Sequence, residues 1–397
     1  MFFNRILLAT FCLLPSWAIS LSTNNILLAQ ATQHYLAYNY KNAAHDYFSI
    51  VQTEQSCMPA WLGYGICCHN LGLFEQADNA FKRAFEHDAN QGACSKLRLH
   101  ALRTQRWQDA CTYGLNPYWW YETDIQHKTV LITSEKAGIG DIVQFLRYLK
   151  RLHNAGAHVI LEAPAYLHPM LSGCPFIVKL MLPHSNSSCD ITLRVSTPEL
   201  TLTMCNTLQN PCIDVPYIYA DPQRLAYWHN KLAPDTHFKI GLCWHPSTMI
   251  NTQTGKEVAN PRSIPLSCFS SLCDLTSCSF YSLQVGSGSE QVTTCAFPIH
   301  VFDEKTFDRS YGAFNDTLAV MKQLDLIITA DTSIAHIAGA LGVPVWVILP
   351  ACSDFRWFLD TDRSPWYPTM RLFRQTTYGD WGTVLKEVYA QLAKIVE

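Results

Sequence analysis

Residues 326–349 constrain the fold more than any other part of the sequence, and they read LIITADTSIAHIAGALGVPVWVIL. Short apolar runs at 326–330 and 345–349 are typical of buried strands. Between these runs, apolar residues recur at i, i+3, i+4 and i+7 from Ile334 to Leu341, a spacing that predicts a helix with one apolar face. A glycine and a proline then supply stop signals. We therefore predict a strand–helix–strand crossover, the unit of a parallel α/β sheet.

The start of this helix is a candidate phosphate site. Asp331, Thr332 and Ser333 are three consecutive residues of types that act as N-caps. A helix N-terminus at the carboxyl end of a strand presents N–H groups and the positive end of the helix dipole, and small hydroxyl residues there let a phosphate come close. The same three residues can also do no more than cap the helix. The local pattern leaves phosphate binding and simple capping as open alternatives.

The composition indicates a folded chain of several domains. At 397 residues the chain is long enough for two or three of them. Hydrophobic residues make up 48% and charged residues 15%, so we expect well-filled cores rather than disorder. The net charge of −3 provides no basic field, and we therefore expect no nucleic-acid partner.

The sixteen cysteines are scattered along the chain, apart from the neighbours Cys67 and Cys68. Two cysteines with the CxxC spacing do not occur, so neither a zinc ribbon nor a thioredoxin motif is indicated. We expect most of these residues to be reduced thiols inside cores, as in a reducing compartment. The sequence also shows no evident set of metal ligands, and no metal cofactor is expected.

The N-terminal segment, residues 1–20, points to a different compartment. It combines Arg5, an apolar run at 6–14, and small residues at Ala18 and Ser20, which is the pattern of a signal peptide. The alternative is a hydrophobic N-terminal helix that docks on the next domain. The apolar run is too short to span a membrane. Both interpretations stay open.

An internal repeat occupies residues 24–122. Six residues match the small and aromatic packing positions of a tetratricopeptide repeat: Trp61, Tyr64, Gly65, Ala77, Phe81 and Ala84. One period earlier, the equivalent positions hold Ala31, Ala43 and Tyr47, and a third repeat is degenerate. Small residues in this pattern let two helices approach, and aromatic residues fill the groove between them. We predict a helical domain that is either a surface for a protein partner or a buttress for the next domain.

From residue 129 the pattern changes to alternating strands and helices, which predicts a Rossmann-like half over 127–235. Its first strand leads into the sequence GIGD, where Gly138 and Gly140 allow a tight turn and a close backbone approach at the start of a helix. Asp141 can cap this helix or act as a general base at the strand end.

Two further residues of this helix, Gln144 and Arg147, follow Asp141 at helical spacing. Together with the GIGD loop they predict a polar face that continues along the helix. We regard this face as a candidate acceptor side of a site.

A second Rossmann-like half is predicted over 236–397, with a closing helix at 381–397. Its first strand, 239–244, carries Trp244 at the carboxyl end. The polar loop that follows, 246–261, is long, and long ordered loops at strand ends are usually functional.

Two polar residues of this half are candidates for binding a nucleotide. Arg262 follows the long loop and could supply a fixed cation to a diphosphate, although a plain surface arginine is the alternative. Gln284 ends a predicted strand at 280–284 and has an amide able to read a base or ribose. A further strand is predicted at 300–302, and a loop rich in aromatic and charged residues over 354–368.

Two Rossmann-like halves with a cleft between them describe the GT-B glycosyltransferase architecture. Four runs of residues also resemble one family of such enzymes. The chain resembles bacterial tetratricopeptide proteins with a glycosyltransferase family 9-like domain, a family that includes the ADP-heptose:lipopolysaccharide heptosyltransferases. The resemblance covers roughly residues 25–390. It is carried by GIGDIVQFLRYL (138–149), RSIPL (262–266), DTSIAHIAGALGVPVW (331–346) and DFRWFLDTDRSPWYPTMRLFRQ (354–375).

The resemblance implies an inverting, metal-independent sugar transfer from a nucleotide-diphospho sugar to a glycan, a lipid-linked glycan or a protein. The aspartate of the family's GD loop, taken as the base, corresponds to Asp141, and the basic residue that neutralises the diphosphate corresponds to Arg262. The family's phosphate-binding segment maps onto Asp331, Thr332, Ser333, Ala335 and His336. For His336, a packing role is the alternative.

The remaining candidate residues divide between the two substrates. We assign Trp244 and Gln284 to the nucleotide side, and Gly138, Gly140, Gln144 and Arg147 to the acceptor side. A non-catalytic tetratricopeptide adaptor with a degenerate transferase domain is the alternative function. A Rossmann-type oxidoreductase is disfavoured, because no GxGxxG motif stands in a first strand–helix unit.

The expected compartment follows from the donor. Nucleotide sugars are cytosolic, so we expect a cytoplasmic protein, either free or held at the inner face of the membrane by its N-terminal segment. The alternative is export through residues 1–20, which would separate the enzyme from its donor.

Overall fold

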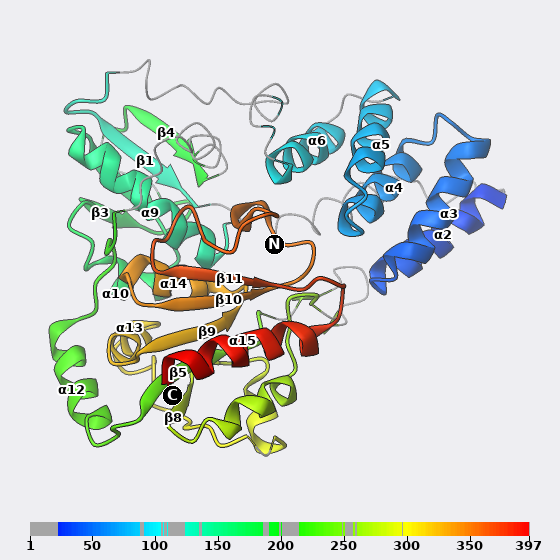
Figure 1. Cartoon of the computed structure of the whole chain (residues 1–397). Coiled ribbons are helices and arrows are strands. Elements are labelled where there is room, and N and C mark those ends of the chain that lie inside the picture. The colour runs from blue at the N-terminus through cyan, green and yellow to red at the C-terminus, as the bar shows by residue number, and fades with distance from the viewer. Residues whose placement is uncertain are drawn as a thin grey trace. The chain divides into compact units, whose positions relative to one another are not determined.

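The fold is known from a computed structural model of the chain (Figure 1). It describes residues 23–87, 91–104, 106, 109, 124–134, 137–185, 190–197, 200, 214–247, 249–250, 257–258, 260–295 and 297–396. The chain forms two compact units. The first consists of Met1–Asn116, Thr248–Pro261 and Cys352–Asp360, and the second of Pro117–Ser247, Arg262–Ala351 and Thr361–Glu397.

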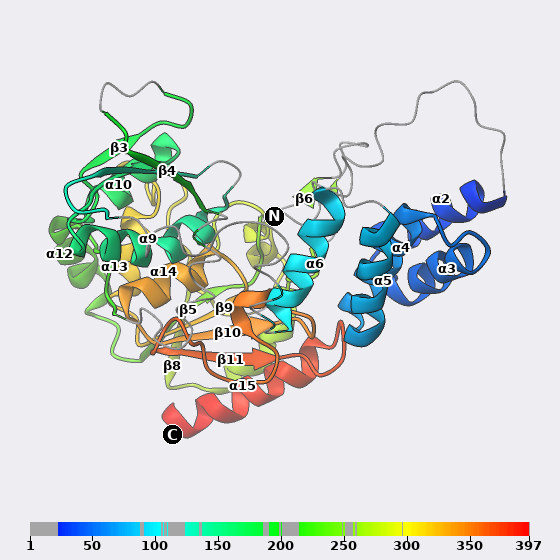
Figure 2. The same ribbon diagram turned by 90° about the horizontal axis from the view of Figure 1, so that it is seen from above.

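The first unit is built from successive helices that pair as hairpins (Figure 2). These helices are α2 (Thr23–Leu36), α3 (Tyr40–Thr53), α4 (Met58–Asn70), α5 (Phe74–His87) and α6 (Gln91–Arg103). Small residues control how closely they pack. A Cβ atom added at Gly65 would lie 2.6 Å from the ring of Phe81, and one at Gly63 would lie 2.5 Å from the ring of Tyr47. The rings therefore lie directly on helix backbone, as the small-and-aromatic pattern requires.

The helical domain expected near the N-terminus is thus present, while its assignment as tetratricopeptide repeats stays a prediction. Residues 1–22 and 110–123 lie outside the described part of the chain, and so does the signal-like segment at 1–20. Within the described residues, no helix is long and apolar enough to cross a membrane.

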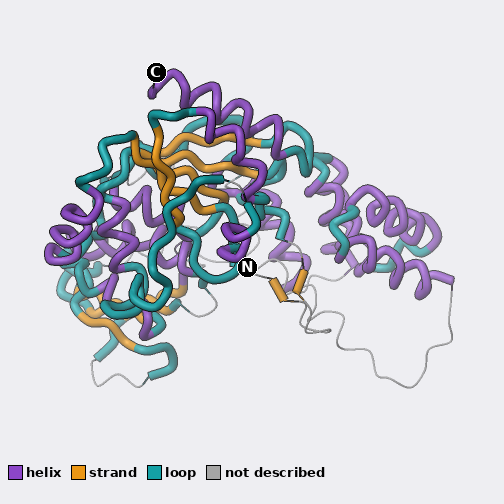
Figure 3. The backbone as a smooth tube through the Cα atoms, turned by 90° about the horizontal axis from the view of Figure 1, so that it is seen from below, coloured by secondary structure: helices purple, strands orange, loops and turns teal. Residues whose placement is uncertain are grey.

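Segments from the second half of the sequence also belong to the first unit. The short 3-10 helix η4 (Phe355–Trp357) contacts α6, and the thiol of Cys352 donates to the carbonyl oxygen of His69 at 3.3 Å. The two short strands β6 (Met249–Ile250) and β7 (Glu257–Val258) pair antiparallel within the predicted loop 246–261 (Figure 3). Most of that loop lies outside the described residues.

The second unit contains two parallel sheets, as the alternating strand–helix pattern predicted. The first has the strand order β3-β2-β1-β4. Its strands are β1 (Thr129–Thr133), β2 (His158–Glu162), β3 (Lys179–Met181) and β4 (Leu193–Ser196). The helix α9 (Ile139–Asn154) connects β1 to β2, and η1 (Ala165–Leu167) with α10 (His168–Leu171) precede β3. This sheet corresponds to the first predicted Rossmann-like half.

The second sheet has the order β11-β10-β9-β5-β8, and all its strand pairs are parallel. Its strands are β5 (Phe238–Cys243), β8 (Cys278–Ser282), β9 (Leu326–Ala330), β10 (Val345–Leu349) and β11 (Met370–Arg374). The crossover helix α14 (Ser333–Leu341) joins β9 to β10 and ends at Gly342, whose φ of 70° is left-handed. The strand–helix–strand prediction for 326–349 is therefore confirmed.

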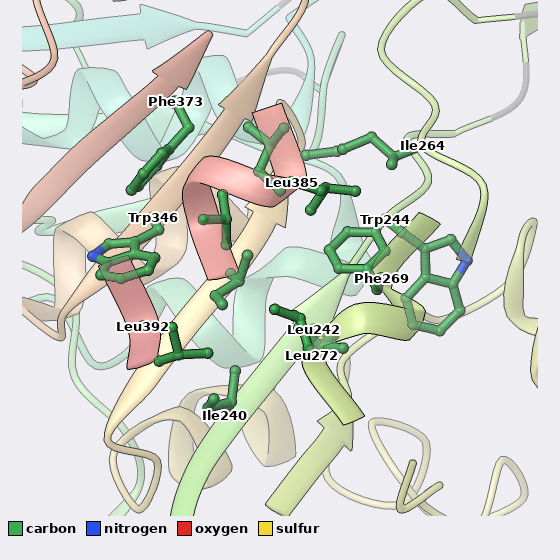
Figure 4. Packing of buried hydrophobic residues seen from close by; sticks show 14 of the residues in the cluster. Ile240, Leu242, Trp244, Ile264, Phe269, Leu272, Trp346, Phe373, Leu385 and Leu392 are labelled. Carbon is green, nitrogen blue, oxygen red and sulfur yellow. The ribbon is translucent and has the colours of Figure 1, made fainter. Parts of the chain in front are cut away.

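One large core fixes the second sheet against the C-terminal helix (Figure 4). The helix α15 (Trp381–Val396) and the 3-10 helix η2 (Leu266–Asp274) pack on one face, where alternate strand residues such as Ile240, Leu242 and Ile348 are fully buried. Helix α14 contacts β9 and β10 and is buried along nearly its whole length. Burial on both faces explains why these strands are continuously apolar.

One prediction about this half is wrong, and two further elements were not predicted as the structure has them. The strand expected at 300–302 is a single bridge between His300 and Tyr281. Strand β11, for which the sequence made no prediction, begins just after the loop predicted over 354–368. Finally, α12 (Pro222–Leu232), placed in the first half by sequence, packs on α13 (Asn315–Met321), where Nε of Arg224 donates to Oδ1 of Asp316 at 2.7 Å. The boundary at residue 235 stays a prediction.

Candidate site at the junction of the two sheets

The first turn of α14 lies where the strands of the second sheet end. Thr332 is its N-cap, because its backbone is extended and its Oγ1 accepts from the N–H of Ile334 at 3.2 Å. Strand β9, which precedes it, is buried at every residue. Thr332 and Ser333 keep partial exposure, while Ala335 is fully buried. The capping interpretation is therefore confirmed for Thr332, and phosphate binding at this turn stays a prediction.

Neighbouring strand ends place further polar groups beside this turn. Strand β5 pairs with both β9 and β8, so the residues after these three strands meet at one edge. Cys243, the last residue of β5, has its sulfur 3.7 Å from Oγ1 of Thr332. In an open parallel sheet, this carboxyl edge is where ligands bind.

Arg262 and Asp331 meet at the same edge. Nη1 of Arg262 lies 3.6 Å from Oδ2 of Asp331, and 33% of the Arg262 side chain stays exposed against 7% for Asp331. A carboxylate repels a phosphate, so Asp331 is suited to orient the arginine and not to bind the phosphate directly. The exposed third of the Arg262 side chain can face a ligand.

Two predicted nucleotide contacts are engaged inside the fold. The ring of Trp244 is fully buried in the core, and its Nε1 donates to the carbonyl oxygen of Gly288 at 3.1 Å. The amide oxygen of Gln284 accepts from the N–H of His245 at 2.8 Å, and its Nε2 donates to the carbonyl oxygens of His245 and Ser287. Both side chains thus order the turn after β5, and their assignment to the nucleotide side stays a prediction.

The GIGD turn lies at the start of α9, and it approaches α14 closely. Asp141 Oδ2 accepts from the N–H of Gly138 at 2.8 Å, so this carboxylate caps α9. A Cβ atom placed on Gly140 would lie 2.7 Å from Cδ2 of His336. Helices α9 and α14 lie side by side (Figures 1 and 2), and the absence of a side chain at residue 140 is what lets their first turns touch.

Gln144 and Arg147, which were predicted to continue a polar face along α9, are buried. Their exposed fractions are 0% and 1%, so both side chains are inside the junction. Nη1 of Arg147 donates to the carbonyl oxygen of Trp366 at 2.7 Å, and Nη2 donates to the hydroxyl of Tyr217 at 3.0 Å. Both the apolar and the polar face of α9 are covered. Residues from outside the first sheet, such as Tyr217 and Trp366, pack on the face that would contact water if the first Rossmann-like half stood alone.

Sequence reasoning missed two tyrosines at this junction. The hydroxyl of Tyr367 lies 3.0 Å from Nδ1 of His336 and accepts from the hydroxyl of Tyr217 at 3.4 Å. Close packing on Gly339, where a Cβ would lie 2.4 Å from the Tyr367 ring, holds this ring against α14. Tyr217 lies outside the runs that carry the resemblance, whereas Tyr367 lies inside the run 354–375. An aromatic residue facing a helical glycine is the kind of pair that packing favours.

Electrostatics keep the groups of this junction in defined states. Burial raises the pKa of Tyr367 well above its ordinary value, so its hydroxyl stays protonated. Burial alone would lower the pKa of the Arg147 guanidinium, but the oxygens of Tyr217, Tyr367 and Tyr148 raise it, and the group keeps its charge. Among the described residues, no cluster of three or more His, Cys, Asp or Glu side chains could hold a metal ion.

Comparisons with known proteins give the following likenesses. No family model matches the chain. Protein FlbA of Caulobacter vibrioides is 26% identical over 181 residues, which cover 44% of this chain and 28% of FlbA. The match thus spans less than a third of that relative.

Solved structures that resemble the chain include two bacterial transferases. A glycosyl transferase family 9 protein from Veillonella parvula is 12% identical with a TM-score of 0.48, covering 69% of this chain and 92% of its own. The ADP-heptose LPS heptosyltransferase II of E. coli is 13% identical with a TM-score of 0.45, covering 67% and 99%. The Thermobaculum terrenum O-GlcNAc transferase is 9% identical with a TM-score of 0.30, covering 94% and 92%.

Proposed function

We propose that this chain is a GT-B-type glycosyltransferase that takes its sugar from a nucleotide-diphospho sugar. The observation that carries the proposal is the close approach of Gly140 to His336. It brings together two sequence motifs, GIGD and DTSIAH, that lie on different sheets and that resemble family 9 transferases. Both motifs follow the carboxyl end of a strand, the position where α/β folds bind their ligands.

In the proposed reaction, a hydroxyl of the acceptor attacks the anomeric carbon of the donor sugar. The bond from that carbon to the diphosphate breaks in the same step, so the configuration inverts. Asp141 takes the proton of the attacking hydroxyl. The departing diphosphate is stabilised by the N–H groups at the start of α14 and by Arg262, which Asp331 orients. In this proposal, the positive charge that stabilises the departing diphosphate comes from Arg262 and the N-terminus of α14.

The acceptor class in this proposal is a glycan, a lipid-linked glycan or a protein. The helical unit would bring a protein partner or support the transferase unit. A cytoplasmic site of action is proposed because the donor is made there.

One observation favours the alternative, a non-catalytic adaptor. The carboxylate of Asp141 already has a structural partner in the N–H of Gly138. An aspartate retained only as a cap would fit a transferase domain that has lost its chemistry.

A thermal-shift panel of ADP-, UDP- and GDP-sugars separates the two functions. A ligand at about 100 times its Kd stabilises the folded state by about 2.7 kcal/mol, which is readily measured as a raised melting temperature. We expect one nucleotide class to stabilise the protein in the presence of EDTA as well as without it. Silence across the whole panel would favour the adaptor.

Replacement of Arg262 by glutamine is expected to raise the Kd for the stabilising nucleotide sugar roughly tenfold, measured by calorimetric titration. The change removes a cation and leaves the Asp331 carboxylate to repel the diphosphate. Arg83→Gln is the matched control, because Arg83 is an exposed arginine of the helical unit that pairs with Glu86 at 3.2 Å. An unchanged Kd in Arg262→Gln would remove Arg262 from the donor site.

A further inference from the structure

A chain of hydrogen bonds leads from Arg147 to His336 through the interior of the second unit. It runs from Nη2 of Arg147 to the Tyr217 hydroxyl at 3.0 Å, on to the Tyr367 hydroxyl at 3.4 Å, and then to Nδ1 of His336 at 3.0 Å. Every member is buried, with exposed fractions of 1%, 0%, 0% and 6% in that order. Packing in the protein interior, and not solvent, therefore sets the geometry of these hydrogen bonds.

The first member of this chain gives it a direction. A guanidinium has five N–H donors and no acceptor, so the oxygen of Tyr217 must accept from Arg147. The proton of Tyr217 then points to the oxygen of Tyr367, and the proton of Tyr367 points to Nδ1 of His336. Reversing the chain would direct the Tyr217 proton toward a cation. The hydrogen bond between the two tyrosines runs in the forward direction, from the Tyr217 hydroxyl to the Tyr367 oxygen.

The guanidinium itself is held in place. Its Nε donates to the carbonyl oxygen of Gln144 at 2.9 Å and its Nη1 to that of Trp366 at 2.7 Å. Its carbon lies 4.5 Å from the centre of the Tyr367 ring and 5.3 Å from that of Tyr217. A fixed, charged donor at one end imposes its polarity on the hydroxyl groups that follow.

We infer that Arg147, Tyr217 and Tyr367 form a one-way hydrogen-bond relay that holds His336 as a neutral imidazole with its proton on Nε2. When Nδ1 accepts a hydrogen bond, the ring of a neutral histidine carries its proton on the other nitrogen. The edge of the ring that bears Nε2 faces the GIGD turn, since Nε2 lies 3.4 Å from a Cβ position on Gly140. The inferred proton on Nε2 thus lies on the edge of the ring that faces the GIGD turn.

This inference deepens the proposed function and rests on it for the identity of the ligand. His336 contributes a neutral donor to an oxygen of the nucleotide sugar and acts neither as a cation nor as a base. Arg147, Tyr217 and Tyr367 are positioning residues, because they act on the ligand only through His336. The relay itself is a property of the ligand-free protein and can be measured without any substrate.

Nitrogen NMR of the full chain with ¹⁵N-labelled histidine tests the relay directly. The ring nitrogens of His336 are assigned by comparison with His336→Gln, and their shifts report which nitrogen carries the proton. We expect Nε2 to be protonated and Nδ1 unprotonated at neutral pH. A proton on Nδ1, or on both nitrogens, in the wild-type protein overturns the inference.

Tyr367→Phe removes the donor to Nδ1 while keeping the ring that packs on α14. We expect His336 to lose its single tautomer in this variant. Tyr47→Phe is the control: it removes a buried hydroxyl of the helical unit, one that contacts Oγ1 of Thr32 at 3.2 Å, and should leave the His336 signals unchanged. An unaltered His336 tautomer in Tyr367→Phe would also overturn the relay.

Binding measurements then connect the relay to the ligand. Tyr367→Phe should raise the Kd for the nucleotide sugar roughly threefold to tenfold. His336→Gln, whose amide reaches the position of Nε2, should bind more tightly than His336→Asn, whose amide reaches only the position of Nδ1. If no nucleotide sugar binds, the proposed function is wrong, and the NMR measurement of the His336 tautomer still decides whether the relay exists. Equal affinities of the two variants would contradict the Nε2 donor.

Discussion

Replacement of Asp141 by asparagine is expected to lower the rate of sugar transfer by roughly 10²- to 10⁴-fold and to leave the melting temperature nearly unchanged. The rate falls because an amide cannot take the proton of the attacking hydroxyl, and general-base catalysis contributes about that factor. Stability is kept because the amide oxygen can still accept from the N–H of Gly138, as the carboxylate does at 2.8 Å. Release of the nucleoside diphosphate under saturating substrate, followed with time, measures the rate.

Asp141→Ala is the matched variant that separates the two roles of this residue. Alanine removes the base and the cap together, so activity falls as in Asp141→Asn, and the folded state also loses about 1 kcal/mol. A structural aspartate predicts the opposite pattern, in which Asp141→Asn is fully active and only Asp141→Ala is affected. That pattern would show that another group takes the proton or that Asp141 serves α9 alone.

The strand–helix–strand unit at the centre of the fold could be read from the sequence because local signals agree there. The apolar runs coincide with β9 and β10 to the residue, and the predicted stop at Gly342 is the left-handed residue that ends α14. Burial on both faces makes such strands continuously apolar, and a short crossover leaves little freedom in register.

Elements whose identity depends on distant partners were harder to predict. Strand β11 has the sequence MRLFR and follows a stretch rich in proline and aromatic residues, so its composition resembles that of a loop. It becomes a strand because β10 offers a paired edge from Val345 to Leu349. The segment at 300–302 has strand-like residues but only one bridge, to Tyr281, so pairing rather than propensity decides both cases.

The candidate site shows the same division. Asp331 and Thr332 come directly after β9, a strand that the sequence pattern locates, and Arg262 comes after the long loop that follows β5. The spacing of Arg147 predicts a polar face of α9, but the pattern of a single helix does not show what covers that face. Its partners Tyr217 and Trp366 are 70 and 219 residues away in the sequence, a separation that no local pattern reports.

Gly140→Ala is expected to destabilise the second unit by about 1–2 kcal/mol and to displace His336. The new Cβ would lie 2.7 Å from Cδ2 and 3.4 Å from Nε2 of that ring, so one of the two residues must move. Overpacking of this kind costs about 1–3 kcal/mol. The gain in helix propensity from glycine to alanine, at most about 1 kcal/mol, offsets part of it. Thermal denaturation measures the loss, and NMR of His336 measures the displacement.

Gly138→Ala is the control within the same motif. Its backbone has φ −74° and ψ 164°, which any residue adopts, and among the described residues a Cβ there would meet Oδ2 of Asp141, at 3.3 Å, and no ring. We expect this variant to remain within about 0.5 kcal/mol of the wild type. If the two glycines were needed only for backbone flexibility or to let a ligand approach, Gly138→Ala and Gly140→Ala would instead be equally stable.

A double-mutant cycle with His336→Ala identifies the clash as the cause. Removing the imidazole opens the space that the Cβ of residue 140 needs, so Gly140→Ala should cost little or even stabilise the protein in that background. The coupling between the two positions should then be about 1–3 kcal/mol, the size of the overpacking term. Additive effects would mean that Gly140 is required for something other than the approach of α9 to His336. The contact between Gly140 and His336 would then not be what brings the two motifs together.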